Sequence, residues 1–218
     1  MRWHSSVEGT TEVAAPGWPA TVVEGRVGIR PLRLRDAPVW SELRIRNEAW
    51  LSPWEGRQPS LPPVGWEERH SQGAFAAMLR VLRREAKEGR SLPFALTYDG
   101  DLAGQVTVAS IVRGAFQNGN VGYWVDGRLA GRGVMPTALA MVVDHCFTRA
   151  GLHRIEADVR PENAPSRRVV EKLGFREEGL HPRFLHIDGD WRDHLCFAVT
   201  VEDAPEGLLR RWLSRENA

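Results

Sequence analysis

A glycine-bearing turn is the part of this sequence whose residue types and spacing point most directly to chemistry. Arg128, Gly131 and Gly133 form an R-x-x-G-x-G pattern between a run typical of a strand and a run typical of a helix. Glycine lets the backbone approach a ligand closely, and a helix N-terminus presents unpaired N–H groups and the positive end of its dipole. The pattern alone also fits a plain turn, but the flanking strand and helix favour a phosphate-binding site.

Two further segments follow the turn in a recognisable order. Asn163 and Ser166 give an N-x-x-S start to a predicted helix that ends at a Leu-Gly-Phe run containing Gly174, and a predicted hairpin covers 184–194. Together with the turn, these motifs resemble the GNAT N-acetyltransferases over residues 26–201. The hairpin is similar to that of the RimJ-type alanine N-acetyltransferases, which modify ribosomal-protein N-termini.

The resemblance implies the GNAT acyl-CoA N-acyltransferase fold, an α/β fold with a mixed, mostly antiparallel sheet flanked by helices. It also implies acetyl-CoA as cosubstrate. The turn would hold its pyrophosphate and the strand edge at 123–125 would pair with its pantetheine. The splay of that strand from 155–159 would leave N–H groups free for the thioester oxygen. The residues expected to bind the cofactor are Trp124, Val125, Arg128, Ala130, Gly131, Arg132, Gly133, Val134, Met135, Asn163, Ser166 and Arg167. Either Arg167 or Arg168 is expected to meet the phosphates from the start of the next helix, and a solvated surface face is the alternative role for the arginines.

The proton for the departing thiolate is assigned to a hydroxyl. Many GNAT enzymes carry a tyrosine four residues before the glycine of L-G-F, and here that position is Val170. The ribosomal-protein branch uses the serine of N-x-x-S instead, which matches Ser166 and implies a catalytic role for it. The alternative is that Ser166 and Asn163 only cap the helix, which both residue types do well.

The general base is assigned to carboxylates on a predicted strand. Glu156 and Asp158 are two residues apart and so share one face of the strand, and the base of another ribosomal acetyltransferase branch matches Asp158. A relative of the RimJ-type branch carries a carboxylate at the position of Leu185, where this chain departs from the pattern. Salt-bridged strand residues are the alternative. A weak base suffices for an N-terminal amine, because its pKa is about 8 against about 10.4 for lysine.

The acceptor site is expected between a Pro-rich loop, 50–66, and the hairpin region 180–191. Its expected substrate-binding residues are Trp54, Glu55 and Leu185, and Glu55 could pair with a cationic acceptor. The histidines in and beside the hairpin match no standard set of metal ligands, so no metal is expected.

The elements that position these groups are predicted from periodicity. Residues 1–25 lack a clear period and are expected to form a flexible N-terminal arm, followed by one domain over 26–218 that ends in an amphipathic helix. Asp99-Gly100 predicts a hairpin turn, and the apolar spacing in 134–147 predicts a helix with one buried face. Predicted strands cover 27–34, 94–98, 102–108, 120–125, 155–159, 175–186 and 191–201; predicted helices cover 39–45, 72–88, 135–150 and 161–173.

Composition narrows the classes of protein that remain. The 218 residues are 42% hydrophobic with a net charge of +1, which is typical of one globular domain and gives no reason to expect nucleic-acid binding. No apolar run approaches the ~20 residues of a membrane span, and the N-terminus lacks a secretory signal. Cys146 and Cys196 lie in apolar segments and are predicted to be buried free thiols, which favours the cytoplasm. A homodimer is a possible assembly.

The sequence therefore predicts an enzyme that moves acetyl from acetyl-CoA to an amine by direct attack in a ternary complex. The expected acceptor is a protein N-terminal α-amine, of the ribosomal protein S5 type. One alternative is acetylation of a small-molecule amine, an antibiotic or a lysine side chain. Another is a non-catalytic acyl-CoA-binding or interaction module, which the missing tyrosine and the departure at Leu185 leave open.

Overall fold

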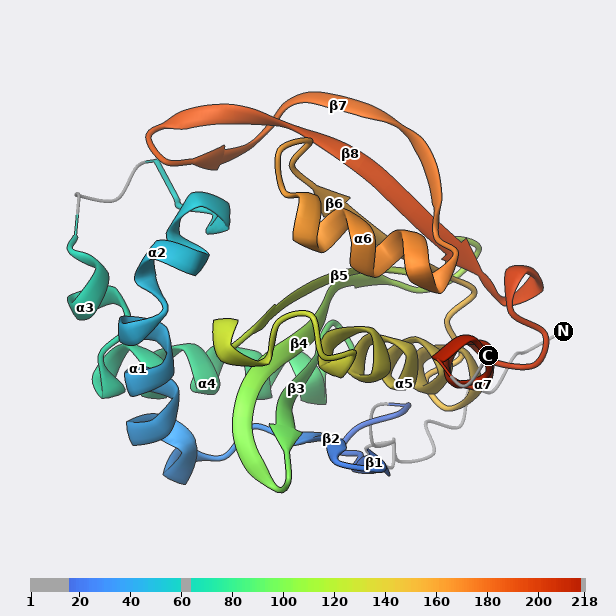
Figure 1. The fold of residues 1–218 in the computed structure, drawn as a ribbon, viewed down its shortest axis with the longest axis horizontal. Helices are drawn as coiled ribbons and strands as arrows, with labels where there is room; N and C mark the ends of the chain where they lie inside the picture. Colours follow the sequence, from blue (N-terminus) through green and yellow to red (C-terminus); the bar gives the residue numbers. More distant parts are fainter. Residues whose placement is uncertain (1–15, 60–63, 217–218) are drawn as a thin grey trace, which may run out of the picture.

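An eight-stranded sheet runs through the computed structural model, which describes residues 16–59 and 64–216. The strand order is β1-β2-β3-β4-β5-β6-β8-β7, and every neighbouring pair is antiparallel except β5 and β6 (Figure 1). The strands are β1 (Val22–Glu24), β2 (Val27–Pro31), β3 (Leu92–Tyr98), β4 (Asp101–Val112), β5 (Asn118–Val125), β6 (Arg154–Val159), β7 (Arg176–Ile187) and β8 (Asp190–Thr200). The predicted mixed, mostly antiparallel sheet is confirmed.

Helices cover both faces of the sheet, as consecutive strand residues show. The side chain of Phe94 belongs to the core cluster that includes α5, whereas Ala95 belongs to the cluster beneath α1 and α4. Because neighbouring strand residues point to opposite faces, the two clusters lie on opposite sides of the sheet. The helices are α1 (Ala37–Arg46), α2 (Glu48–Leu51), α3 (Trp66–Arg69), α4 (Gln72–Lys87), α5 (Val134–Thr148), α6 (Ala164–Leu173) and α7 (Leu208–Glu216); short 3-10 helices are η1 (Leu34–Asp36), η2 (Ser52–Trp54), η3 (Gly127–Leu129) and η4 (Val201–Asp203).

The turn predicted at Asp99-Gly100 joins β3 to β4. Both residues have positive φ, 53° and 88°, as the tight turns that match the twist of a hairpin require.

Helix α5 is buried far more completely than its predicted single apolar face. Every residue of 134–143 is buried, because the sheet covers one side and α7 and the N-terminal segment cover the other. Trp212 of α7 is 4% exposed and donates from its indole Nε1 to Thr137 Oγ1 at 2.9 Å. Helix α5 is therefore a buried core helix and not an amphipathic surface helix.

The described part of the predicted N-terminal arm is ordered on the body of the protein. Val22–Glu24 pairs with β2 across a turn in which Gly25 has a φ of 53°. Trp18 packs its ring edge-on against Phe94 at 5.3 Å, and the carbonyl of Gly17 lies 2.7 Å from a ring nitrogen of His145. A flexible arm up to residue 25 is thus too long a prediction. Residues 1–15 of it lie outside the described part of the chain.

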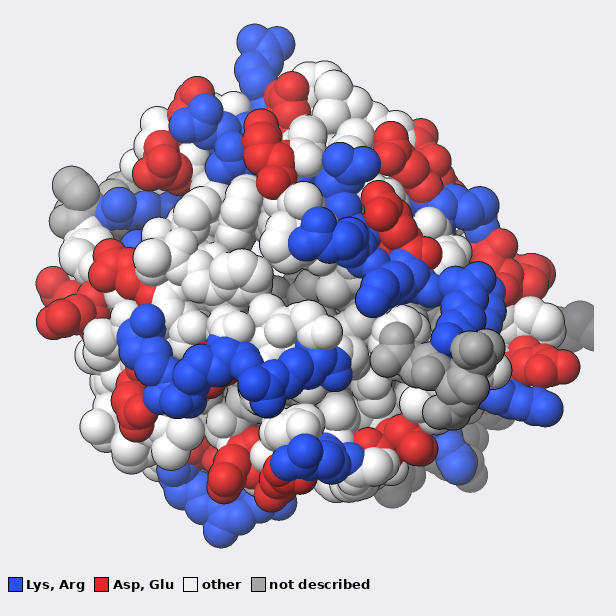
Figure 2. Space-filling view, viewed as in Figure 1, with Lys and Arg blue, Asp and Glu red and all other residues white. Residues whose placement is uncertain are grey.

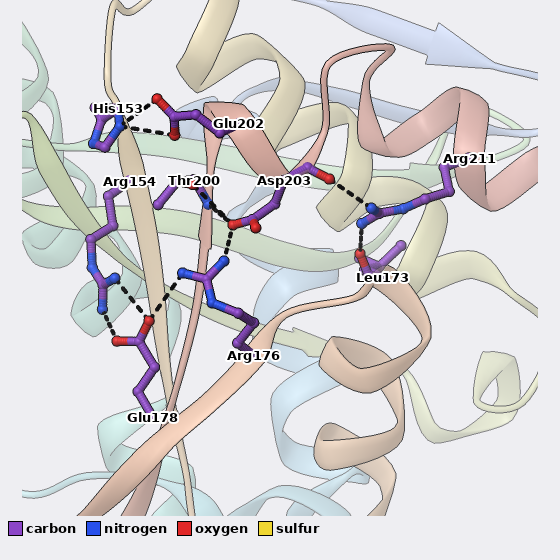
Figure 3. A network of polar contacts seen from close by, with 9 residues as sticks. All are labelled: His153, Arg154, Leu173, Arg176, Glu178, Thr200, Glu202, Asp203 and Arg211. Carbon is purple, nitrogen blue, oxygen red and sulfur yellow. Dashed lines mark hydrogen bonds and ion pairs between the residues drawn. The ribbon is translucent and has the colours of Figure 1, made fainter.

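A polar network fastens the C-terminal region to the strands beside it (Figure 3). Arg154 of β6 and Arg176 of β7 share Glu178, at 3.1 and 3.2 Å, and Arg176 also pairs with Asp203. Arg211 of α7 donates to the backbone carbonyl of Asp203 at 2.9 Å. These contacts hold η4 and α7 against the sheet edge, where α7 can cover α5.

The two cysteines are buried and unpaired, as predicted. Burial raises the pKa of Cys146 to about 12 and that of Cys196 to about 11, so neither thiol is poised to act as a nucleophile. None of the helices in the described ranges is both long and apolar enough to cross a membrane.

Candidate active site

The sheet opens between its two parallel strands. β5 and β6 pair only at Asn118 with Arg154, Gly119 with Ile155 and Asn120 with Glu156. Beyond Asn120, β5 remains paired with β4, and β6 with β8. The backbone groups of β5 that face this gap therefore have no strand partner, which confirms the splay implied by the resemblance.

A cavity of about 720 Å³ lies at this opening and reaches both faces of the sheet. Tyr123 points toward α6, and the next residue, Trp124, packs edge-on against Trp40 of α1 at 6.4 Å. Among the predicted site residues, those that line the cavity are Trp54, Glu55, Trp124, Val125, Ala130, Gly131, Gly133, Val134, Met135, Asn163 and Ser166. Those outside its lining are Arg128, Arg132, Glu156, Asp158, Arg167 and Leu185.

The donor end of the cavity is made of backbone. Gly131 and Gly133 have φ values of 77° and 73°, a region that costs side-chain-bearing residues roughly 1 kcal/mol or more. A Cβ built at Gly131 meets no atom within 4 Å, so the space in front of it is open. Gly133 caps α5 without a side-chain hydrogen bond, which leaves N–H groups of the first turn for a ligand. This geometry fits a pyrophosphate.

Asp126 holds this turn in place from behind. Burial alone would raise its pKa, but hydrogen bonds from Arg128, Arg46 and Asn47 lower the pKa of Asp126 to about 2. Arg46 and Asn47 belong to the end of α1, and their side chains reach Asp126 at 2.8 and 3.1 Å. The carboxylate thus fastens the donor turn to a helix on the opposite face of the sheet. Arg128 is engaged here and does not line the cavity.

Helix α6 contributes two basic side chains to the cavity lining. Arg168 and Lys172 line the cavity, whereas Arg167 pairs with Glu171 at 3.5 Å along the helix surface. Figure 2 shows Lys and Arg gathered over α6 and over the turn before α5, with uncharged surface between them. One residue along a helix is a rotation of about 100°, so Arg167 and Arg168 point in different directions and only Arg168 of the two lines the cavity.

A pair of hydroxyl groups lies where the two ends of the cavity meet. Tyr123 Oη is 2.9 Å from Ser166 Oγ. Asn163 caps α6 by accepting from the backbone N–H of Ser166 at 3.2 Å, so the serine hydroxyl is free to face Tyr123. Burial raises the pKa of Tyr123 well above its ordinary value, so this phenol is neutral and can donate. Val170, where many relatives have tyrosine, is buried in the core.

The two predicted base carboxylates share a face of β6, but neither is free. Glu156 accepts from Arg154 Nε at 2.7 Å. Asp158 accepts from Asn120 Nδ2 at 2.5 Å, and its other oxygen lies 3.2 Å from His181 Nδ1. Asn120 lines the cavity, so Asp158 stands directly behind the wall and not in it.

Asp158, His181 and Cys196 bring possible metal-ligand atoms within 4.8 Å of one another. Oxygen, nitrogen and sulfur are the ligands that zinc takes, but a bound thiol must lose its proton. Burial raises the pKa of Cys196 to about 11, which opposes that loss. We assign no metal to the cluster.

The acceptor end of the cavity is made of side chains. Arg44 is buried with its guanidinium 5.2 Å from the Trp66 ring and 5.1 Å from the Trp124 ring, and it pairs with Glu55. Arg69 also pairs with Glu55, at 2.9 Å. Glu55 therefore lines the cavity with its charge already balanced, which leaves two guanidinium groups against one carboxylate.

His70 completes this cluster as a neutral ring. Burial, and then the charge of Arg44, lower the pKa of His70 to about 4. Its Nδ1 lies 2.8 Å from the carbonyl of Trp66 and donates there, and its Nε2 lies 2.9 Å from Arg44 and 3.1 Å from Glu55. In the neutral ring Nε2 carries no proton, so it accepts from Arg44. Burial, and then Arg69, also lower the pKa of Arg44, to about 10.

The β7–β8 hairpin reaches over the acceptor end, along the top of Figure 1. Gly56 forms an isolated bridge with Ile187, so the hairpin touches the segment after η2. Arg160 lies over the Trp54 ring at 5.5 Å and donates to the carbonyl of Pro53 at 2.9 Å. Leu185 is 41% exposed on the hairpin, away from the cavity lining.

A mixed sheet that opens beside a glycine cradle is the architecture of an acyl-CoA-dependent acyltransferase. The acetyltransferase (GNAT) domain model matches residues 26–176, and the chain belongs to this family of N-acetyltransferases.

Relatives with known structures or curated names agree with this placement. The structure of RimJ from Mycobacterium smegmatis in complex with CoA-disulfide is similar with 45% identity and a TM-score of 0.88, covering 92% of this chain and 97% of that one. The [ribosomal protein uS5]-alanine N-acetyltransferase of Escherichia coli (strain K12) is 31% identical over 84% of this chain and 91% of its own length. The probable N-acetyltransferase YjcK of Bacillus subtilis (strain 168) is 43% identical over 48% of this chain, a match that spans 58% of that relative.

Proposed function

We propose that this protein transfers acetyl from acetyl-CoA to the α-amine of a protein N-terminus, as the uS5-type relatives are named for doing. The observation that carries the proposal is the single cavity through the β5–β6 opening. It joins a backbone cradle suited to a pyrophosphate to a separate end lined by aromatic and charged side chains. That arrangement supports a ternary complex and direct attack without an acyl-enzyme.

The donor acetyl-CoA supplies an activated thioester. Gly131, Gly133 and the first turn of α5 bind its pyrophosphate, and Arg168 and Lys172 add positive charge. The free edge of β5 beyond Asn120 pairs with the pantetheine, and its N–H groups stabilise the thioester oxygen as negative charge develops there.

Ser166 is the proton donor to the departing thiolate, with Tyr123 behind it. The 2.9 Å contact lets the phenol orient the serine hydroxyl, which gives its proton to the sulfur and takes back the proton that the attacking amine releases. The two hydroxyls together replace the tyrosine that position 170 lacks. This role goes beyond helix capping, because Asn163 already serves as the cap.

The acceptor end favours an N-terminal α-amine over a lysine. Two buried or half-buried guanidinium groups, Arg44 and Arg69, face one carboxylate, and this excess positive charge disfavours a protonated amine. An α-amine is already about half neutral near pH 8, whereas lysine needs over 3 kcal/mol to lose its proton at that pH, at 1.36 kcal/mol per pKa unit.

The test is acetyl transfer to a panel of peptides and small amines, followed by mass spectrometry to place the acetyl group. The expected product is an Nα-acetyl peptide from sequences that begin with alanine. The matched control is the same peptide with its N-terminus blocked and an internal lysine left free, which should stay unmodified. Acetylation of the blocked peptide, or of small amines alone, would contradict the proposal. Tight CoA binding with no turnover on any amine would favour a non-catalytic module.

A further inference from the structure

Asn120 lies in the cavity wall at the point where β5 and β6 separate. It is the last residue of β5 that pairs with β6, so it lies at the base of the opening. Asn120, Gly122 and Trp124 alternate along the strand and therefore share one face, which Trp124 identifies as the face of α1. A donor that extends from the cradle along Val125 and Trp124 reaches this base last. The side chain of Asn120 thus belongs to the acceptor side.

The contacts of Asn120 fix which way its amide points. Its Nδ2 donates to Asp158 Oδ2 at 2.5 Å, the only hydrogen bond of this side chain within the described ranges. A carboxylate only accepts hydrogen bonds, so the amide nitrogen must face Asp158. The amide oxygen, Oδ1, consequently faces away from Asp158 and toward the cavity that Asn120 lines.

Asp158 is itself enclosed by neighbouring side chains. Its side chain is 7% exposed, and its second oxygen lies 3.2 Å from Nδ1 of His181 on β7, without a hydrogen bond between them. Cys196 of β8 is the register partner of Asp158, and its sulfur lies within 4.8 Å of a carboxylate oxygen. A buried carboxylate that accepts from the Asn120 amide can keep that amide from flipping.

We infer that Asn120 presents its side-chain carbonyl to an N–H of the acceptor amine and that Asp158 is a positioning residue that orients Asn120. This deepens the proposed function and rests on it. An amide oxygen accepts a hydrogen bond from a neutral amine and leaves the nitrogen lone pair directed at the thioester. The base strength of Asp158 is then not what the reaction uses.

Four variants test the inference by acetyl-transfer kinetics on whichever amine the wild type acetylates. Asn120→Ala should lower kcat/KM for the acceptor about 30-fold, while the KM for acetyl-CoA stays within about 2-fold, because misplacing a bound reactant slows chemistry. Asp158→Ala should lower it about 10-fold. The double variant should be no slower than Asn120→Ala alone, since residues that act through one another are not additive. Glu206→Ala, which removes an exposed carboxylate elsewhere, should match the wild type.

Exchanging the two side chains between positions 120 and 158 is the most specific test of the inference. Asn120→Asp alone should be as slow as Asn120→Ala, because two carboxylates cannot share the hydrogen bond. Asn120→Asp combined with Asp158→Asn reverses that bond, still offers an oxygen to the cavity, and should return kcat/KM to within about 5-fold of the wild type.

Two results would overturn the inference while the proposed function stood. One is wild-type kinetics for Asn120→Ala. The other is a double variant slower by the product of the single effects, about 300-fold, which would make Asp158 an independent base. If the wild type acetylated no amine at all while binding CoA, the proposed function would fall and this inference with it.

Discussion

The two ends of the cavity are built from different parts of the polypeptide. The donor end consists of backbone groups from one continuous stretch, β5 to α5, and its glycines leave room for a ligand. The acceptor end consists of side chains from α1, η2 and the residue after η2, with α3 and the β7–β8 hairpin packed beside them, and these segments meet only in the folded protein. Backbone recognition is therefore local and insensitive to most substitutions, whereas side-chain recognition can change with a few residues. One donor can thus serve many acceptors.

The largest expected effect is at the donor end. Gly131→Val should weaken CoA binding about 1,000-fold, because a β-branched residue disfavours a φ of 77° and fills the space before the cradle. Isothermal titration calorimetry measures the affinity. Gly100→Val, at a hairpin turn with a φ of 88° and equally open space, is the matched control and should bind CoA normally. If both variants bound CoA with equal affinity, the turn that contains Gly131 would not be the CoA-binding site.

At the acceptor end the expected effect is on stability as a function of pH. The pKa of His70 is lowered to about 4 in the folded protein, so its contribution is complete above pH 6.5 and is lost as the pH falls through 4. The wild type should lose roughly 3 kcal/mol of unfolding free energy over that window from this group, at 1.36 kcal/mol per unit. Urea unfolding from pH 7 to 4 should show a shallower dependence in His70→Gln. Parallel curves would mean that His70 is not the titrating group.

Where the two ends meet, Ser166→Ala should lower kcat about 100-fold, at the low end of the range for loss of a general acid. CoA affinity should hold, because the Asn163 cap and the cradle remain. Tyr123→Phe should have a smaller effect of the same kind, since the phenol is proposed only to orient the serine. Single-turnover kinetics would check this, and an unchanged rate in Ser166→Ala would leave the serine as part of the helix start only.

The smallest effect concerns the link between the ends. Asp126→Asn should destabilise the protein by roughly 2 kcal/mol at pH 7, because the pKa of Asp126 is lowered to about 2 by Arg128, Arg46 and Asn47 against the effect of burial. A group with a lowered pKa stabilises above its unfolded value, so the difference from the wild type should shrink as the pH falls from about 4 to 2. Chemical denaturation across that range measures it; a constant difference would contradict the assignment.

The same contrast explains how far the sequence could be interpreted. The hairpin at Asp99-Gly100, the α5 start after Gly133 and the cap at Asn163 follow from local rules and are confirmed. The burial of α5 on both sides could not be predicted from local rules, because α7, which covers α5, lies some 60 residues further along the chain.

Side-chain partners at the site were also beyond local rules. Glu55 was expected to meet a cationic substrate, yet Arg44 and Arg69 already occupy it, from 11 residues before it and 14 after it. The contact of Tyr123 with Ser166 spans 43 residues. The alternation of side chains along β5 predicts only that Tyr123 and Trp124 point to opposite faces of the sheet. Spacing predicts which residues share a face of an element, but not which residues far away in the sequence contact them.

The opening of β5 also gives the molecule an unusual pattern of exchange with solvent. A strand with four strands on one side of it and three on the other would normally be among the slowest to exchange its amide hydrogens. Past Asn120, however, the β5 amides that face β6 have no ladder partner and border a cavity. Deuterium should therefore enter the middle of this sheet as readily as a surface turn, and bound donor should close that entry. Hydrogen exchange at the β5 amides, in the middle of the sheet, would then reveal bound ligand more directly than exchange at the edge strands.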